Sequence, residues 1–140
     1  MAFAYFAYGS NLWLPRMRSR CPSAVAIAPA RLDGWVVRYA KPGRDGTAKL
    51  DIEERPAGSV RGVVYAIDDG DRGALDAAEP GYLAIEVSVA TDAGDLSTLT
   101  YRWPGAATSA PPAAWYRSMV MAGARDHRLP EAYVGVALRG

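Results

Sequence analysis

The sequence has few of the side chains that build metal centres and cross-links, because its 140 residues include one cysteine and one histidine. Cys21 has no second cysteine with which to form a disulfide, and together with His127 it cannot complete a zinc site of the usual Cys/His type. The spaced glycines and the lysine of a phosphate-binding loop are also missing after the first apolar segment. These absences exclude Cys/His metal chemistry and give no indication of nucleotide binding.

A strong net charge is missing as well, because sixteen basic residues balance fifteen acidic ones and leave a formal charge of +1. Phosphate backbones and anionic lipid surfaces attract proteins that carry a large positive field. We therefore expect no nucleic-acid partner. The densest basic group, Arg16, Arg18 and Arg20, is more typical of a solvated face than of an anion site.

The sequence also lacks a long hydrophobic run near its start. The apolar segment 1–8 is too short to cross a bilayer, has no basic leader, and is followed by Gly-Ser-Asn instead of a cleavage site. Since paired cysteines are absent too, we expect a cytoplasmic protein with no membrane partner. Nothing in the sequence indicates an oligomeric state.

Half of the residues are hydrophobic, and a chain of this length can bury a core without cross-links. No repeat and no linker divides the sequence, so a single domain over residues 1–140 is predicted. Residues 3–8 are apolar at odd and even positions, which indicates a central strand covered on both faces. The turn formers Gly-Ser-Asn follow, ahead of a short helix over residues 12–20.

The rest of the sequence alternates between strand patterns and turn formers. Residues 71–78 can form a helix that the Pro-Gly pair after Glu79 ends, which places Glu79 at a helix-to-strand junction. Another helix is expected from Pro112 onward, and residues 128–140 should contain one more short helix or strand. The predicted strands are residues 24–32, 35–40, 47–54, 59–67, 82–91 and 96–103, of which the last two form a hairpin.

The predicted elements favour one fold class. Strands outnumber helices, and the two do not alternate strictly, which indicates an α+β fold instead of a doubly wound parallel sheet. We predict a mostly antiparallel or mixed sheet that curls into a small β-barrel. The helices should flank this barrel at its rim.

Two local features could carry chemistry. The turn of Gly9, Ser10 and Asn11 presents backbone N–H groups that suit a carboxylate or a developing oxyanion, although a plain turn explains the same pattern. Glu79 is a lone carboxylate at a junction, and its position alone is typical of a solvent-exposed helix end.

The other titratable residues indicate structure more than chemistry. His127 lies among charged residues at the end of a predicted helix and is expected on the surface. Cys21 has no local base and is interpreted as a structural thiol. Asp51, Glu53 and Glu54 are typical of a wetted strand edge, not of an acid/base pair.

The opening segment Tyr-Phe-Ala-Tyr-Gly-Ser-Asn-Leu, residues 5–12, resembles the signature of the gamma-glutamylcyclotransferase-like family. Further landmarks follow in family order over nearly the whole chain, among them Gly62-Val63-Val64-Tyr65 and the spaced Glu79. The resemblance implies a small mixed barrel with flanking helices and no cofactor. It also implies conversion of a small gamma-glutamyl amide into 5-oxoproline and a free amine.

The resemblance implies roles for individual residues too. Glu79 matches the family's catalytic acid/base, and burial would have to raise its pKa before it could accept a proton from an α-amine. Tyr82 and Tyr116 match tyrosines at the substrate cavity. The substrate-binding loop corresponds to Tyr5, Phe6, Ala7, Tyr8, Gly9, Ser10 and Asn11.

Several functions remain compatible with this resemblance. The substrate could be a gamma-glutamyl amino acid, dipeptide or simple amine, or a gamma-glutamyl-lysine, polyamine or carrier-protein conjugate. A non-catalytic module that binds a small ligand is the alternative from another class. Pro80 stiffens the backbone beside Glu79 and bears on substrate choice. Segment 41–50 is hard to align with the family, so no residue role is transferred to it.

Overall fold

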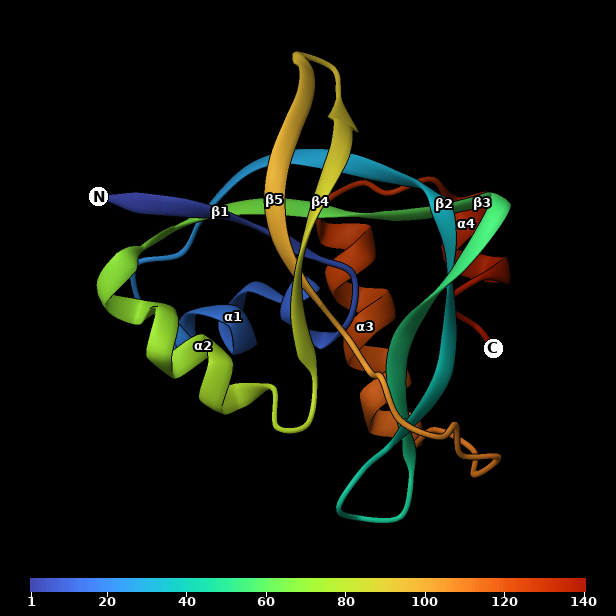
Figure 1. The fold of residues 1–140 in the computed structure, drawn as a ribbon. Helices are drawn as coiled ribbons and strands as arrows, with labels where there is room; N and C mark the ends of the chain where they lie inside the picture. Colours follow the sequence, from blue (N-terminus) through green and yellow to red (C-terminus); the bar gives the residue numbers. More distant parts are fainter.

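The computed structural model describes residues 1–140 and contains a closed, five-stranded β-barrel with helices around it (Figure 1). This confirms the predicted fold class. The strands are β1 (Ala2–Ala7), β2 (Val25–Pro42), β3 (Ala48–Asp68), β4 (Leu83–Thr91) and β5 (Gly94–Arg102). The helices are α1 (Leu14–Arg20), α2 (Arg72–Ala78), α3 (Ala114–Asp126) and α4 (Glu131–Val136), with 3₁₀ turns η1 (Ser10–Leu12) and η2 (Asp69–Asp71).

The barrel is mixed because one of its strand pairs is parallel. The strand order is β1-β3-β2-β4-β5, and β1 closes the ring by pairing with β5 in the parallel sense at Tyr5 and Leu99. The other pairs are antiparallel. β1 is therefore flanked on both sides, as its apolar sequence indicates, and its C-terminal end delivers the Gly-Ser-Asn turn to one end of the barrel.

The prediction of four separate strands between residues 24 and 67 is wrong, because the structure contains two long strands there. β2 and β3 run 18 and 21 residues and pair with each other along most of their length (Figure 1). Gly34 adopts φ +87°, so the chain makes an irregularity in the ladder there without leaving the sheet. The Asp-Gly dipeptide thus marks a bend in β2 and not a turn between strands.

The helices lie on two sides of the barrel. In Figure 1, α1 and α2 lie close together near the N-terminal strand, whereas α3 packs on the other side of the turn that follows β1. α2 and the β4-β5 hairpin agree closely with the predicted ranges. α3 begins at Ala114, so the prediction of Pro112 as its first residue is two positions early.

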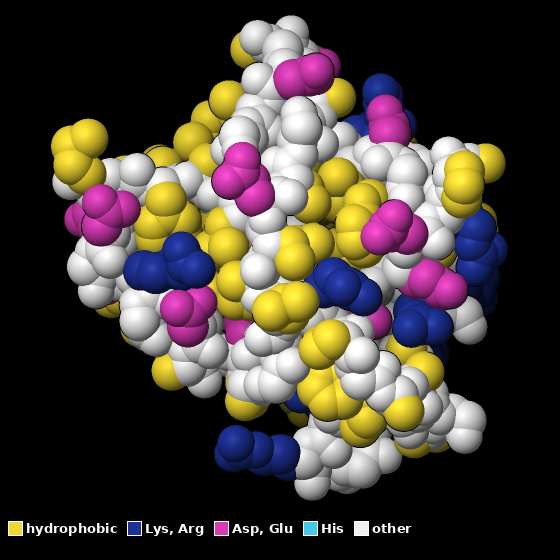
Figure 2. Space-filling model, in the orientation of Figure 1, with side chains coloured by type: hydrophobic (Ala, Val, Ile, Leu, Met, Phe, Trp, Pro, Cys, Tyr) yellow, Lys and Arg dark blue, Asp and Glu magenta, His cyan; other side chains and the backbone are white.

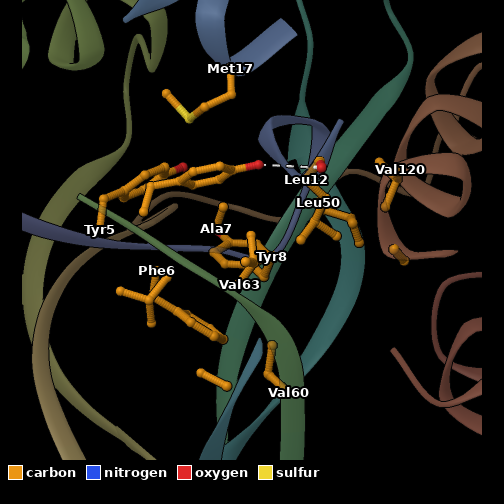
Figure 3. Close-up of a cluster of buried hydrophobic side chains, with 14 of the residues drawn as sticks. Tyr5, Phe6, Ala7, Tyr8, Leu12, Met17, Leu50, Val60, Val63 and Val120 are labelled. Carbon is orange, nitrogen blue, oxygen red and sulfur yellow. Dashed lines mark hydrogen bonds between the residues drawn. The ribbon is translucent and has the colours of Figure 1, made fainter. Parts of the chain in front are cut away.

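The hydrophobic core is one cluster of 26 buried residues that joins the barrel to the helices. Figure 3 shows part of it, where side chains of β1, β3, α1 and α3 converge. Phe6 and Val63 are fully or nearly fully buried inside the sheet, while Met17 and Val120 bring the helices onto it. The end of β1 is consequently fixed from several directions.

Charged side chains of both signs are interspersed on the face shown in Figure 2. None of the helices is long and apolar enough to span a bilayer. No group of three or more His, Cys, Asp or Glu side chains is arranged to hold a metal ion.

Candidate active site

The Gly-Ser-Asn turn forms η1 at the C-terminal end of β1 and leaves backbone donors free. Leu12 N–H donates to the Gly9 carbonyl at 3.0 Å, and Trp13 N–H donates to the Ser10 carbonyl at 3.1 Å. The N–H groups of Gly9, Ser10 and Asn11 have no acceptor in the protein. Asn11 is buried and Gly9 and Ser10 are half-buried, and three free donors on one such turn suit an oxygen ligand.

The carbonyl side of this turn is held by buried side chains. The Tyr65 hydroxyl donates to the Asn11 carbonyl at 2.8 Å, and His127 Nε2 lies 2.9 Å from the Leu12 carbonyl. The His127 ring also packs edge-on against Tyr65. The prediction of a surface role for His127 is therefore wrong, since a residue 115 positions away in sequence supports the turn.

Glu79 enters the same site from the C-terminal end of α2. Its Oε1 accepts a hydrogen bond from Asn11 Nδ2 at 3.1 Å and lies 3.7 Å from Arg20 Nη1. Arg20 Nη1 in turn donates to Asn11 Oδ1 at 2.8 Å, so the three side chains fix one another. The Glu79 side chain is 16% exposed, and the expectation of an exposed carboxylate from its position alone is wrong.

Burial raises the pKa of Glu79 to about 7. The positive charges of Arg20, Arg16 and Lys41 and the Asn11 hydrogen bond act in the opposite direction and lower it. The net shift is upward because the free energy that the carboxylate loses on leaving water exceeds the stabilisation that these partners provide. At neutral pH the group is poised between its acid and base forms, as proton transfer in both directions requires.

Several tyrosines line the cleft with Glu79. They differ in whether their hydroxyl protons are already used in hydrogen bonds within the protein. Tyr82 donates its proton to the Leu50 carbonyl at 2.6 Å, whereas Tyr116 accepts the Leu50 N–H at 3.1 Å and keeps its own proton free. Tyr5 accepts from Asn11 at 3.0 Å and is free in the same way. Tyr116 and Tyr5 can therefore donate to a ligand, while Tyr82 can only accept from one.

These groups enclose a cleft that opens to the surface. Of the residues predicted for the site, only Phe6 and Ala7 do not line it, because they point into the core. Leu50 and Tyr101 line it although neither was predicted. The lining comprises Tyr5, Tyr8, Gly9, Ser10, Asn11, Leu50, Glu79, Tyr82, Tyr101 and Tyr116.

The arginine group was only partly predicted. Arg18 is exposed, as a solvated face requires, but Arg20 contacts Glu79 and Asn11, and Arg16 lines an adjoining cavity. The strand-edge interpretation fails for Asp51, which is fully buried and accepts the Trp103 N–H at 2.8 Å. In each case a partner distant in sequence decides the environment.

Replacing Tyr116 by phenylalanine should weaken both stability and activity. The change leaves the buried Leu50 N–H without an acceptor, which costs about 1–3 kcal/mol of unfolding free energy, measurable by urea titration. It also removes a free hydroxyl donor, so kcat/KM for the substrates named below should fall about tenfold.

The matched control for that change is Tyr39→Phe. Tyr39 donates to the Leu138 carbonyl at 2.6 Å outside the cleft and packs edge-on against Tyr116. Its loss should lower stability with little change in kcat/KM. Equal kinetic losses in the two variants would contradict a ligand-directed hydroxyl on Tyr116.

Comparison with known proteins agrees with this geometry. Residues 59–136 match the model of the AIG2-like family. The gamma-glutamylcyclotransferases of Bos taurus and Homo sapiens are each 33% identical to this chain, over 94% of it and 75% of their own length. This chain belongs to that family. The resemblance noted in the sequence is thereby confirmed.

Solved structures place the family's barrel over the whole chain. A protein titled gamma-glutamyl cyclotransferase superposes with a TM-score of 0.90 at 30% identity, covering 100% of this chain and 88% of its own. A human protein titled uncharacterized superposes with a TM-score of 0.89 at 32% identity, covering 99% and 87%. The family fold therefore includes every element that lines the cleft.

Proposed function

We propose that this protein is an enzyme of the gamma-glutamylcyclotransferase type, which cyclises the gamma-glutamyl part of small gamma-glutamyl amides to 5-oxoproline and releases the free amine. The observation that carries the proposal is the buried Glu79 carboxylate, whose pKa burial raises to about 7, beside three unpaired N–H groups on one turn. The names of the relatives support the same class of reaction.

The reaction needs no second reactant. The substrate's α-amine nitrogen forms a bond to its own γ-carbonyl carbon, and the bond from that carbon to the amide nitrogen breaks. In our proposal Glu79 accepts a proton from the α-amine and delivers it to the departing nitrogen, so protons balance. Holding nucleophile and carbonyl in contact can lower the barrier of such intramolecular reactions by about 7–11 kcal/mol in ideal cases.

The remaining groups of the cleft bind and orient the substrate. The free N–H groups of Gly9, Ser10 and Asn11 and the Tyr116 hydroxyl are donors for the α-carboxylate or the developing oxyanion. A Cβ on Gly9 would lie 3.5 Å from the Tyr116 hydroxyl and 3.7 Å from Leu50 Cβ, so a side chain there would take up space in the cleft. The bare backbone thus keeps its donors accessible.

A substrate panel tests this function directly. Purified protein is incubated with gamma-glutamyl-alanine, gamma-glutamyl-glutamate, gamma-glutamyl-glutamine, gamma-glutamyl-putrescine, Nε-gamma-glutamyl-lysine and glutathione, and 5-oxoproline is measured by mass spectrometry. Release from at least one substrate above a boiled-enzyme control is expected. Binding without release from any of them would favour the non-catalytic module.

The pH dependence should report the buried carboxylate. As general base, Glu79 must be ionised in the free enzyme, so kcat/KM should fall as pH drops below about 7. It should rise further and level off as the substrate amine, with an ordinary pKa of about 8, becomes neutral and nucleophilic, because the neutral amine still carries the proton that Glu79 passes to the leaving nitrogen. Initial rates across this range at constant ionic strength check the profile. An acidic limb near the ordinary glutamate pKa would contradict it.

A further inference from the structure

A second cavity opens beside the cleft and has a different character. Four residues, Ser10, Glu79, Tyr82 and Tyr116, line both spaces. Glu79 therefore stands at their junction, where the amide bond must lie if the glutamyl group fills the first cleft. The second cavity then receives the leaving amine.

Cations dominate the wall of this second cavity. Five positively charged residues line it, and Glu79 is its only carboxylate. One further carboxylate, Asp45, reaches a wall residue by pairing with Lys49 at 3.3 Å. The wall thus carries more positive than negative charge, although the whole protein is nearly neutral. The cationic residues are Arg16, Arg20, Lys41, Arg44 and Lys49.

Lys41 is the least expected of these charges. It is 8% exposed, and no carboxylate lies within ion-pair distance of its ammonium group. Its only close partners are the rings of Tyr82 and Trp103, whose centroids lie 5.1 Å and 5.6 Å from Nζ. A lysine with so little exposed surface usually has an acidic partner, so an unpaired one that lines a cavity favours an anionic ligand there.

Arg16 is also without an acidic partner. It makes no ion pair, its buried Nε has no acceptor, and Nη1 contacts only the Met119 sulfur at 3.6 Å. Arg20 differs, because it already donates a hydrogen bond to Asn11 and forms an ion pair with Glu79. Two cations on the wall, Arg16 and Lys41, consequently have unused donors and no carboxylate within ion-pair distance, and the single charge of Glu79 acts on both only from farther away.

We propose that the leaving amine of the preferred substrate carries two or more negative charges, as in a gamma-glutamyl derivative of an acidic amino acid. This inference rests on the proposed function, because it assigns the leaving-group side of the same reaction. The α-carboxylate of a leaving amino acid compensates one of the two free cations, and a side-chain carboxylate compensates the other. A polyamine leaving group adds positive charge to the wall and is disfavoured.

Isosteric pairs of substrates isolate this charge effect. Gamma-glutamyl-glutamate and gamma-glutamyl-glutamine have nearly the same shape and differ by one charge, as do the aspartate and asparagine derivatives. The acidic member of each pair should have a kcat/KM about tenfold higher at low salt, and the advantage should shrink as ionic strength rises. Gamma-glutamyl-putrescine should be the poorest substrate.

Substitution of the free cations should remove the preference. In Lys41→Gln and Arg16→Gln, the ratio of kcat/KM between the acidic and neutral members should fall toward one. Arg128→Gln is the charge-matched control, because Arg128 is exposed and lies beyond the far end of α3. It should keep the wild-type ratio.

Binding separates this inference from the proposed reaction. Calorimetry on the Glu79→Gln protein gives the dissociation constants of gamma-glutamyl-glutamate and gamma-glutamyl-glutamine without turnover, and the acidic ligand should bind about tenfold more tightly. A neutral ligand that binds or reacts as well as its acidic isostere overturns the inference, even if 5-oxoproline is formed. Failure of every substrate to give 5-oxoproline overturns the proposed reaction, while the binding ratio still decides the inference.

Discussion

Replacing Glu79 by glutamine should slow 5-oxoproline release by about 10²- to 10⁴-fold, the usual contribution of a general acid/base. Glutamine keeps the size of the side chain and an oxygen to accept from Asn11, but it cannot take up the α-amine proton. The loss should fall on kcat, because the donors that we propose to hold the substrate are left in place. Single-turnover and steady-state assays on the best substrate of the panel measure the effect.

The free energy of unfolding serves as the control for this variant. The direction in which the substitution changes it follows from the shifted pKa of Glu79. Burial raises the pKa of Glu79 to about 7, so the folded state holds its proton more tightly than the unfolded state. The resulting destabilisation is absent below the ordinary glutamate pKa and complete above about 7. Glu79→Gln should therefore raise the free energy of unfolding by on the order of 2 kcal/mol at pH about 8 and have little effect at pH about 4.

These two measurements separate chemistry from folding. If the Glu79→Gln variant is slower than the wild-type protein and melts at a higher temperature at alkaline pH, Glu79 is supported as a base whose burial lowers the stability of the fold. Wild-type rates in a well-folded Glu79→Gln protein would contradict its role. Asp51, the one fully buried carboxylate, accepts a hydrogen bond from the Trp103 N–H and would then have to be tested.

The parts of the site that the sequence predicts are local ones. The Gly-Ser-Asn turn is set by three turn formers after an apolar strand, and the junction at Glu79 is set by the Pro-Gly pair that ends α2. Both features depend on neighbours within a few residues, and both occur where the pattern indicates. Family resemblance then supplied Tyr82 and Tyr116, which no local pattern distinguishes from core tyrosines.

The parts that the sequence did not predict depend on distant pairing. Leu50 reaches the cleft because β3 passes beside β2 and Tyr82 and Tyr116 bind its backbone, contacts that span 32 and 66 residues. Lys41 is buried because the end of β2 lies over the rings of Tyr82 and Trp103. Segment 41–50 is hard to align with the family from sequence alone, so neither periodicity nor resemblance predicted the places of these residues.

Gly123 in α3 packs against the backbone of the Gly-Ser-Asn turn too closely to accept a side chain. A Cβ at this position would lie 2.4 Å from Leu12 C and 2.4 Å from Trp13 N, backbone atoms at the end of the turn that carries the free donors. The turn cannot move away from the helix without loss of hydrogen bonds, because His127 and Tyr65 hold the Leu12 and Asn11 carbonyls. Gly123→Ala should cost about 3 kcal/mol or more by overpacking, and chemical denaturation measures the loss.

Gly135→Ala supplies the matched comparison, because a Cβ on this glycine in α4 meets nothing within 4 Å. There the same substitution should stabilise the helix by about 0.5–1 kcal/mol. In folded Gly123→Ala protein, displacement of the turn should lower kcat/KM for every substrate, acidic or neutral, because in our proposal the free N–H groups of Ser10 and Asn11 bind the glutamyl group common to all. Loss of stability with unchanged kcat/KM would instead show that the turn keeps its geometry without close contact to α3.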